Sequence, residues 1–286
     1  MNKKIKFADL PSEYSDLNKS EIVILPVPYD GTSTWQKGAD RGPDALIDAS
    51  ANMELYDIET DSEVYLKGIY TADPVDVDMS PEEMVESVEK SVRKFLDQDK
   101  FVVLVGGEHS VTTGSVRAHL DKYKDFTVLQ LDAHSDLRYE YEGTKYNHAC
   151  VMSRVSEICP IVQVGIRSTD ISEQKALRKS NVFFAEDIYN KTDWVEKVLS
   201  LISDKVYITI DLDVFDPSIM PSTGTPEPGG LLWYNVLMLM KAVFDDKEVV
   251  GFDVVELCPN PNNKAPDFLA AKLIYKLLSY KYLKIK

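Results

Sequence analysis

The sequence of 286 residues lacks the features that mark secreted or membrane proteins. Its N-terminus is positively charged but has no apolar stretch behind it, so we see no signal peptide. The most apolar window, residues 230–240, is interrupted by Asn235 and is too short to cross a bilayer. There are only three cysteines, an odd number without the spacing of a disulfide framework. These absences predict reduced thiols, a cytoplasmic location and no membrane partner.

Glycine, proline and basic side chains are also scarce. The 13 glycines and 14 prolines are scattered, which excludes a linker-rich or collagenous chain. Only 32 Lys and Arg residues stand against 47 Asp and Glu residues, and the formal net charge of −15 disfavours a nucleic-acid partner. A hydrophobic content of 44% is too high for a disordered chain. Because we find no break in composition and no internal repeat, we expect a single domain over residues 1–286.

Short β-branched runs alternate with amphipathic stretches along the chain. Most of these runs are continuously apolar, as strands buried on both faces are. Their regular alternation with helices predicts a three-layer α/β/α fold with a mainly parallel central sheet. The expected strands are residues 21–27, 64–70, 101–105, 126–131, 161–166, 206–210 and 249–255. The expected helices are residues 44–56, 80–97, 110–122, 172–179, 194–203, 231–244 and 266–280, of which 80–97 starts with Ser80 as N-cap.

Three of the expected strands run directly into side chains that bind metal ions. Residues 101–105 lead into Gly-Gly-Glu-His-Ser, residues 126–131 into Asp-Ala-His-Ser-Asp, and residues 206–210 into Asp-Leu-Asp. Because the carboxyl ends of parallel strands form one ligand crevice, segments far apart in sequence can meet there. Residues two apart in an extended segment point to the same side. The acidic and histidine side chains of these motifs are therefore expected to face one point.

Together the three motifs gather four carboxylates and two imidazoles. Unpaired buried carboxylates are strongly unfavourable, and divalent cations remove that cost. The oxygen-rich set suits Mn²⁺ better than Zn²⁺, and shared carboxylates allow six side chains to hold two ions. Each motif alone could be a turn or a helix cap, but their conjunction at strand ends predicts a binuclear manganese site. Its expected ligands are His109, Asp132, His134, Asp136, Asp211 and Asp213.

These motifs resemble those of the ureohydrolases, the family of arginases, agmatinases and related guanidino hydrolases. The resemblance continues in Gly-Ala-Asp-Arg-Gly-Pro at 38–43, Gly-Thr-Pro-Glu-Pro-Gly-Gly at 224–230 and Phe-Asp-Val-Val-Glu-Leu-Cys-Pro at 252–259. It spans residues 26 to 259 in the order found in the family. It implies the arginase-like α/β fold, hydrolysis of a linear amidine C–N bond, and assembly as a homo-oligomer, either a trimer or a hexamer.

The resemblance also implies a role for individual residues. One Mn²⁺ ion would be held by His109, Asp132, Asp136 and Asp211, and a second by His134, Asp132, Asp211 and Asp213. The two ions would bridge and activate a water molecule that attacks the guanidinium carbon, so that urea and an amine are released. Asp136 would pass a proton inside the site, His148 would be the external proton shuttle, and Glu256 would bind the guanidinium group.

Several of these assignments have an alternative that the sequence leaves open. His148 lies in Asn-His-Ala-Cys where many relatives have His-Gly, so a core or surface histidine is the alternative. Asp253 either orients a ligand or is structural. Thr225 either lines the substrate pocket or is only a turn residue. His119, in the middle of an expected helix, is interpreted as an ordinary surface residue.

The loop at residues 137–147 bears on the substrate. It lacks the polar groups with which arginases receive the amino acid end of arginine, and it is acidic and aromatic instead. If Glu140 and Glu142 face the pocket rather than water, they would suit a substrate with a second ammonium group. We therefore expect agmatine, hydrolysed to putrescine and urea in polyamine biosynthesis, with aminopropylagmatine as an alternative. Arg138 could instead receive a carboxylate, as in guanidinobutyrate.

The motifs also bear on the class of reaction. Arginine and formiminoglutamate are further substrates that the same fold would accept. A phosphatase with two metal ions is disfavoured, because the carboxylate of Glu256 would repel phosphate. A metal-binding scaffold without activity is disfavoured because no expected ligand is missing from the motifs.

Overall fold

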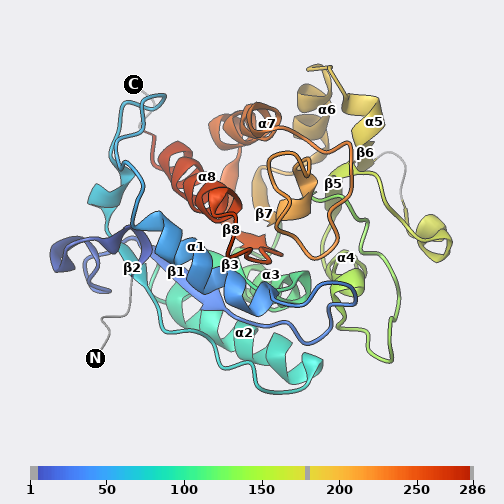
Figure 1. Ribbon diagram of the computed structural model, residues 1–286, viewed down its shortest axis with the longest axis horizontal. Helices are drawn as coiled ribbons and strands as arrows, with labels where there is room; N and C mark the ends of the chain where they lie inside the picture. Colours follow the sequence, from blue (N-terminus) through green and yellow to red (C-terminus); the bar gives the residue numbers. More distant parts are fainter. Residues whose placement is uncertain (1–5, 178–180, 284–286) are drawn as a thin grey trace.

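The computed structural model describes residues 6–177 and 181–283, and within them eight strands form one sheet (Figure 1). Every neighbouring pair of strands runs parallel, which confirms the expected sheet type. The strand order is β2-β1-β3-β8-β7-β4-β5-β6. The strands are β1 (Ile22–Val27), β2 (Ile69–Thr71), β3 (Phe101–Gly106), β4 (Thr127–Leu131), β5 (Ile161–Ile166), β6 (Val182–Phe184), β7 (Lys205–Asp211) and β8 (Glu248–Val255).

Helices cover both faces of the sheet, so the fold has the three expected layers (Figure 1). One layer holds α1, α6, α7 and α8, in which α1 and α7 both pack against α8. The other layer holds α2, α3 and α4, in which α3 packs against both α2 and α4. The helices are α1 (Gly42–Ser50), α2 (Pro81–Leu96), α3 (Thr112–Tyr123), α4 (Val151–Ser156), α5 (Ala185–Ile188), α6 (Trp194–Leu201), α7 (Trp233–Asp246) and α8 (Ala265–Lys281).

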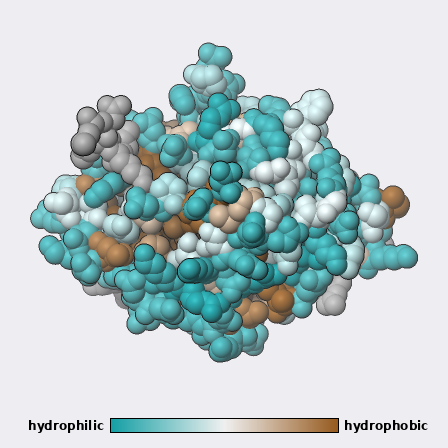
Figure 2. Space-filling model, turned by 90° about the horizontal axis from the view of Figure 1, so that it is seen from below, coloured by the Kyte–Doolittle hydropathy of each residue, from teal (hydrophilic) through white to brown (hydrophobic). Residues whose placement is uncertain are grey.

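The burial of the strands explains why their sequences are continuously apolar. Strands β1, β3 and β4 are buried along their whole length, because helices pack on both faces of the sheet. Seen from the side of α2, the surface is mostly hydrophilic, and hydrophobic residues lie in small separate patches (Figure 2). Within the described residues, no helix combines the length and the apolar character that crossing a membrane requires.

Several element boundaries differ from the sequence prediction. The helix expected at 44–56 ends at Ser50, and the strand expected at 64–70 is a 3₁₀ turn up to Lys67, with β2 starting at Ile69. The helix expected at 172–179 is a 3₁₀ helix at Ile171–Lys175, and residues 178–179 lie outside the described residues. The short elements β6, α4 and α5 were not predicted, because three to six residues carry too little periodicity to detect.

The strand order places the chemically important strands together. Strands β3, β8, β7 and β4 are consecutive neighbours in the middle of the sheet. Strands β3 and β4 are consecutive in this part of the sequence but are not neighbours in the sheet, because β8 and β7 lie between them. The segments that follow these four strands therefore meet at the carboxyl ends of the strands, although they come from residues 107–256.

Candidate metal centre

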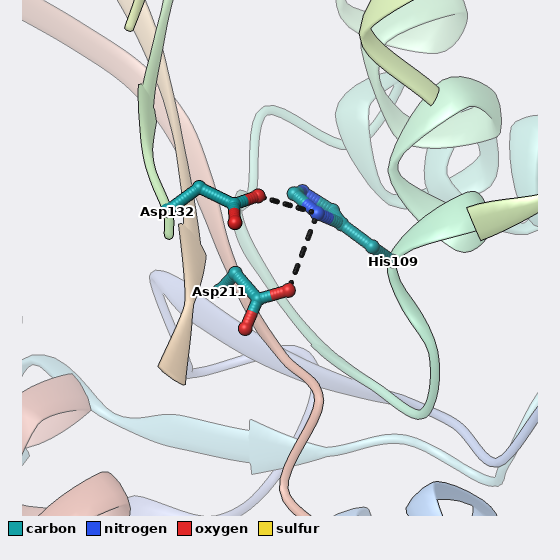
Figure 3. Close-up of side chains that lie close together, drawn as sticks. All are labelled: His109, Asp132 and Asp211. Atoms are coloured by element: carbon teal, nitrogen blue, oxygen red, sulfur yellow. Dashed lines mark ion pairs between the residues drawn. The ribbon is translucent and has the colours of Figure 1, made fainter. Parts of the chain in front are cut away.

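The first histidine of the site is held where β3 ends. Gly107 lies very close to the segment that follows β1. A Cβ atom at this position would lie 2.0 Å from the carbonyl oxygen of Tyr29, so only glycine fits. The backbone N–H of His109 donates to Glu256 Oε1 at 2.7 Å. The imidazole then faces the ends of β4 and β7, where Asp132 and Asp211 point toward it (Figure 3).

Carboxylate oxygens converge on one nitrogen of this ring. The Nδ1 atom of His109 lies 3.1 Å from Asp132 Oδ2, 3.1 Å from Asp136 Oδ2 and 3.5 Å from Asp211 Oδ2. A ligand atom of His109, of Asp132 and of Asp211 all lie within 4.8 Å of one another, which is close enough to hold one ion. These side chains are almost completely buried.

A second cluster adjoins the first. His134 Nδ1 lies 2.9 Å from Asp213 Oδ2 and 3.7 Å from Asp132 Oδ1. Ligand atoms of these three residues also lie within 4.8 Å of one another, so Asp132 belongs to both clusters. The structure thus brings together the six residues that the sequence singled out. Asp132 belongs to both clusters, whereas Asp211, the other residue expected to be shared, belongs only to the first.

Backbone donors fix the orientation of the carboxylates. Asp132 Oδ1 accepts a hydrogen bond from the N–H of His134 at 2.6 Å, and Asp211 Oδ1 accepts one from the N–H of Asp213 at 2.9 Å. The N–H of Ala133 donates to Asp213 Oδ1 at 3.0 Å. These bonds come from the short extended and turned segments after β4 and β7, where alternate residues share one side.

The charges of the cluster are badly balanced without a cation. Burial and the nearby Asp213 raise the pKa of Asp132 to about 7, and burial with the same neighbour raises the pKa of Asp211 well above its usual value. Burial also raises the pKa of Asp213, but the pairing with His134 lowers it to about 2. Four carboxylates against two imidazoles therefore leave negative charge that a divalent cation would neutralise.

A chain of hydrogen bonds sets the tautomer of His109. Thr209 donates its single hydroxyl proton to Asp253 Oδ1 at 2.6 Å. The hydroxyl oxygen of Thr209 lies 2.9 Å from His109 Nε2, so it accepts a hydrogen bond from that nitrogen. Nδ1 is left with a lone pair, and it is buried without a hydrogen-bond partner. A lone pair that faces carboxylates in this way fits a metal ligand, and the chain supports the orienting role for Asp253.

Two other residues of the site have a backbone conformation that residues other than glycine rarely adopt. Asp136 has a φ of 51° and Glu256 a φ of 66°, both in the left-handed region. Such conformations cost on the order of 1–3 kcal/mol each and tend to occur at functional sites. At both positions the strained backbone directs a carboxylate into the pocket that lies beside the two clusters.

This pocket has a volume of about 250 Å³, and its wall includes Trp35, which is 75% exposed. Its walls include seven residues that the sequence predicted at the site: His134, Asp136, His148, Asp211, Asp213, Thr225 and Glu256. The pocket wall does not include Glu140 or Glu142, both of which are exposed. A tight turn, closed by hydrogen bonds between Tyr141 and Thr144, places Glu142 at its tip.

Two other acidic residues line the pocket where the sequence predicted Glu140 and Glu142. Glu173, almost completely buried, and Asp170 lie in the pocket wall after β5. Both contact Arg138, whose Nε is 3.4 Å from Glu173 Oε1 and whose Nη2 is 3.6 Å from Asp170 Oδ2. The guanidinium also stacks on Tyr141, at 4.3 Å from the ring centre. Arg138 is therefore already paired, and two carboxylates outnumber it.

Sequence reasoning missed the residues that support the site from a distance. Thr209 lies inside the strand that leads into the Asp-Leu-Asp motif, and Asp170 and Glu173 lie in a segment without a metal motif. Nothing in the sequence relates these three residues to residues 109 or 138. Arg167 was missed as well, although its guanidinium donates to the carbonyl of Asp213 at 2.6 Å and thereby supports the loop that follows β7. Only the position of Arg167 directly after a strand hinted at such a role.

The interpretation of His119 as a surface residue is wrong. Its side chain is fully buried, and its Nδ1 lies 2.8 Å from the carbonyl oxygen of Ser115. It faces β8 at Gly251, where any Cβ would lie 2.3 Å from the imidazole. Burial lowers its pKa to about 4, so the ring packs as a neutral group.

Comparisons with known proteins agree with this geometry. The family model described as "Arginase family" matches residues 20–279. An N(1)-aminopropylagmatine ureohydrolase of Synechocystis sp. is 41% identical, over 94% of this chain and 90% of the relative. One of Thermus thermophilus is 39% identical, over 97% and 95%. The crystal structure of agmatine ureohydrolase of Thermoplasma volcanium superposes with a TM-score of 0.87 at 33% identity, over 98% and 94%.

Binding of a divalent metal is expected to stabilise the fold. At a free Mn²⁺ concentration 100 times the dissociation constant, the gain is about 2.7 kcal/mol, which would raise the melting temperature by several degrees. Asp132→Asn is expected to abolish most of this gain, because Asp132 belongs to both clusters. Thermal melts with and without Mn²⁺ measure it, and Asp125→Asn, an exposed residue before β4, is the control. An equal gain in Asp132→Asn would contradict the assignment.

The tautomer chain is tested at Thr209. Thr209→Val removes the hydroxyl that accepts from His109 Nε2, so we expect metal affinity to fall about 10- to 100-fold. Thr209→Ser keeps the hydroxyl and is expected to keep the affinity within a few-fold of the unchanged protein. Calorimetric titration with Mn²⁺ measures both, and equal affinities for the Val and Ser variants would refute the role of the hydroxyl.

Proposed function

The chain belongs to the arginase family, and we propose that it hydrolyses the guanidino group of N1-aminopropylagmatine and, less efficiently, of agmatine, releasing urea. The observation that carries this proposal is the charge of the pocket. Glu256 lies beside the metal clusters, and the wall at Asp170 and Glu173 keeps one negative charge more than Arg138 neutralises. A substrate with a guanidinium group at one end and ammonium groups along its tail matches both parts of the pocket.

The comparisons support the longer substrate. Both relatives named above carry the name N(1)-aminopropylagmatine ureohydrolase, whereas agmatine is named for the solved structure at 33% identity. From the sequence alone, agmatine was the first expectation and its aminopropyl derivative the alternative. The two substrates share the guanidino end and differ in the number of ammonium groups in the tail. A wall with an excess of negative charge favours the more highly charged of the two.

The six clustered side chains would hold two divalent ions, and their oxygen-rich composition favours Mn²⁺. His109, Asp132, Asp136 and Asp211 would hold one ion, and His134, Asp132, Asp211 and Asp213 the other. The bound ions would supply a hydroxide nucleophile at neutral pH. The fit rests on the buried Nδ1 of His109, which has no hydrogen-bond partner, and on the excess of carboxylates around it.

Glu256 orients the planar guanidinium group in this mechanism. Its Oε1 already accepts from the N–H of His109, which ties the carboxylate to the segment that carries the metal ligand. A carboxylate that accepts two N–H bonds from a guanidinium fixes the plane of that group, so the carbon is presented to the nucleophile. The left-handed backbone at Glu256 places the side chain in the pocket rather than in the strand packing.

Two residues handle the protons. Asp136 lies in the pocket wall and 3.1 Å from His109 Nδ1, so it can carry a proton from the nucleophile to the amine that leaves. His148 is the only other histidine besides His134 in the described pocket wall, and it would exchange protons between solvent and the site. Thr225 lines the same wall and would contact the substrate.

We further propose a cytoplasmic enzyme with a single domain, which assembles as a trimer or a hexamer. The cysteine count and the absence of a helix able to cross the membrane in the described part of the chain are compatible with that location. The assembly is an expectation from the family resemblance.

The substrate proposal is tested by urea release in the presence of Mn²⁺. We expect kcat/KM to be highest for N1-aminopropylagmatine, lower for agmatine, and at least about 100-fold lower for arginine and guanidinobutyrate, because a carboxylate in the tail would face Asp170 and Glu173. Faster turnover of arginine than of agmatine would overturn the substrate assignment. Binding of two ions without urea from any guanidine would favour an inactive scaffold.

The role of Glu256 is tested by Glu256→Gln. This change keeps the shape but removes the charge that pairs with the guanidinium, so we expect kcat/KM to fall by about 100-fold or more. The Mn²⁺ content should stay at the level of the unchanged protein. Glu186→Gln, an exposed residue of α5, is the control and should leave kcat/KM unaltered. An unaltered kcat/KM in Glu256→Gln would remove Glu256 from the mechanism.

A further inference from the structure

We propose that Glu108 and Thr32 fix the tautomer of His148, so that its Nδ1 keeps a proton and its Nε2 is the nitrogen that exchanges protons in the pocket. The use of His148 in catalysis rests on the proposed function. The tautomer itself does not, because it follows from hydrogen bonds among residues that hold no metal. Glu108 and Thr32 are positioning residues here, since they act on the substrate only through His148.

Glu108 is the one charged residue of the Gly-Gly-Glu-His-Ser motif that the metal clusters leave unused. Its side chain is fully buried, and its hydrogen-bond partners are donors. The N–H of Thr32 donates to Oε2 at 2.6 Å, and the hydroxyls of Thr32 and Ser110 both donate to Oε1 at 2.6 Å. A carboxylate surrounded by donors acts purely as an acceptor. Glu108 therefore determines the direction in which the hydroxyl proton of Thr32 points.

Thr32 transmits this constraint to His148. A threonine hydroxyl has one proton to give, and in Thr32 it is given to Glu108. The oxygen of Thr32 can then only accept further hydrogen bonds. It accepts one from the backbone N–H of His148 at 3.0 Å, and it lies 3.3 Å from His148 Nδ1. The hydrogen bond to Nδ1 exists only if Nδ1 carries a proton.

The loop that carries His148 is tied to the same residue a second time. Asn147 donates from its side chain amide to the carbonyl oxygen of Thr32 at 3.5 Å. Its side chain oxygen accepts from the N–H of Ala149 at 3.0 Å, which starts the 3₁₀ turn His148–Cys150. Backbone and ring are thus both held against Thr32, while the histidine forms part of the pocket wall. Of the two ring nitrogens, Nε2 is the one left for the pocket.

A second chain of carboxylate, threonine and histidine, the one at His109, leaves the other ring nitrogen free. In the chain from Asp253 through Thr209 to His109, the hydroxyl faces Nε2, so Nδ1 is left with the lone pair. In the chain from Glu108 through Thr32 to His148, the hydroxyl faces Nδ1, so Nε2 is left with the lone pair. A buried carboxylate and a threonine thus assign a different free nitrogen to each histidine, one toward the metal centre and one toward the pocket.

The proton balance of the step follows from this tautomer. Neutral His148 accepts a proton from solvent at Nε2 and becomes an imidazolium, while the proton at Nδ1 stays in its bond to Thr32. When the C–N bond of the substrate breaks, the electron pair of that bond goes to the amine nitrogen. The same Nε2 proton is delivered to the amine, directly or through Asp136, and His148 returns to its starting tautomer.

The tautomer is measured by NMR on the full-length, metal-free protein with ¹⁵N-labelled histidine. The chain has only four histidines, so the resonances of His148 are identified by their loss in His148→Asn. About two pH units above the usual histidine pKa of about 6.5, the two ring nitrogens of a neutral imidazole give distinct signals. We expect the protonated signal at Nδ1 in the unchanged protein, in Thr32→Ser and in the control Ser110→Ala. Ser110→Ala removes a hydrogen bond to Glu108 Oε1, the oxygen that also accepts from Thr32, but Ser110 has no hydrogen bond with His148.

In Thr32→Val we expect the preference for Nδ1 to be lost. With Mn²⁺ added, kcat should fall about 10- to 100-fold, while KM and metal content stay within a few-fold, and Thr32→Ser should restore kcat. A protonated Nε2 in the unchanged protein, or an unaltered tautomer in Thr32→Val, would overturn the proposal. If Thr32→Val does not fold, the tautomers of the unchanged protein and of Thr32→Ser decide. A protonated Nδ1 without urea release would uphold the tautomer and refute the proposed function instead.

Discussion

The concentration of four carboxylates in a buried place is the constraint on which the rest of this structure depends. Carboxylates are stable there only if each is oriented by donors and the whole group is neutralised by cations. The chain meets the first condition with its own backbone, because the N–H groups of Ala133, His134 and Asp213 hold three of the carboxylates in place. The protein's own side chains do not meet the second condition, because burial and Asp213 raise the pKa of Asp132 to about 7. Divalent metal ions would meet it.

The same constraint explains why His109 needs neighbours of its own. An imidazole presents a lone pair at only one nitrogen, so a ligand with the wrong tautomer would point a proton at the cation. For His109 the hydroxyl of Thr209, itself held by Asp253, removes that freedom. The cost of burying Asp253 is offset by hydrogen bonds from both Thr209 and Tyr207. Asp253 on β8 thus orients His109, the expected ligand after β3, through the hydroxyl of Thr209 on β7.

The sequence could predict those parts of the site that are tied to strand ends. His109, Asp132 and Asp211 each follow a short, β-branched apolar run that predicts a buried strand, and the rule for parallel sheets then brings them together. Loop residues obey no such rule. Glu140 and Glu142 have the charge that the tail of the proposed substrate requires, but both are exposed, and a turn at residues 141–144 places Glu142 at its tip.

Asp170 and Glu173, the acidic residues of the pocket wall that contact Arg138, come from the segment after β5. Their approach to Arg138 depends on the pairing of β5 with β4, which no local pattern in the sequence encodes. The ion pairs with these two acidic residues change the electrostatic effect that Arg138 has on the pocket. A lone arginine in a guanidine pocket would repel a cationic substrate and attract a carboxylate, whereas Arg138 together with two acidic residues gives a wall with one more acidic than basic side chain. In the proposed function, selection among guanidines therefore depends less on which charged residues the loop contains than on which of them neutralise one another.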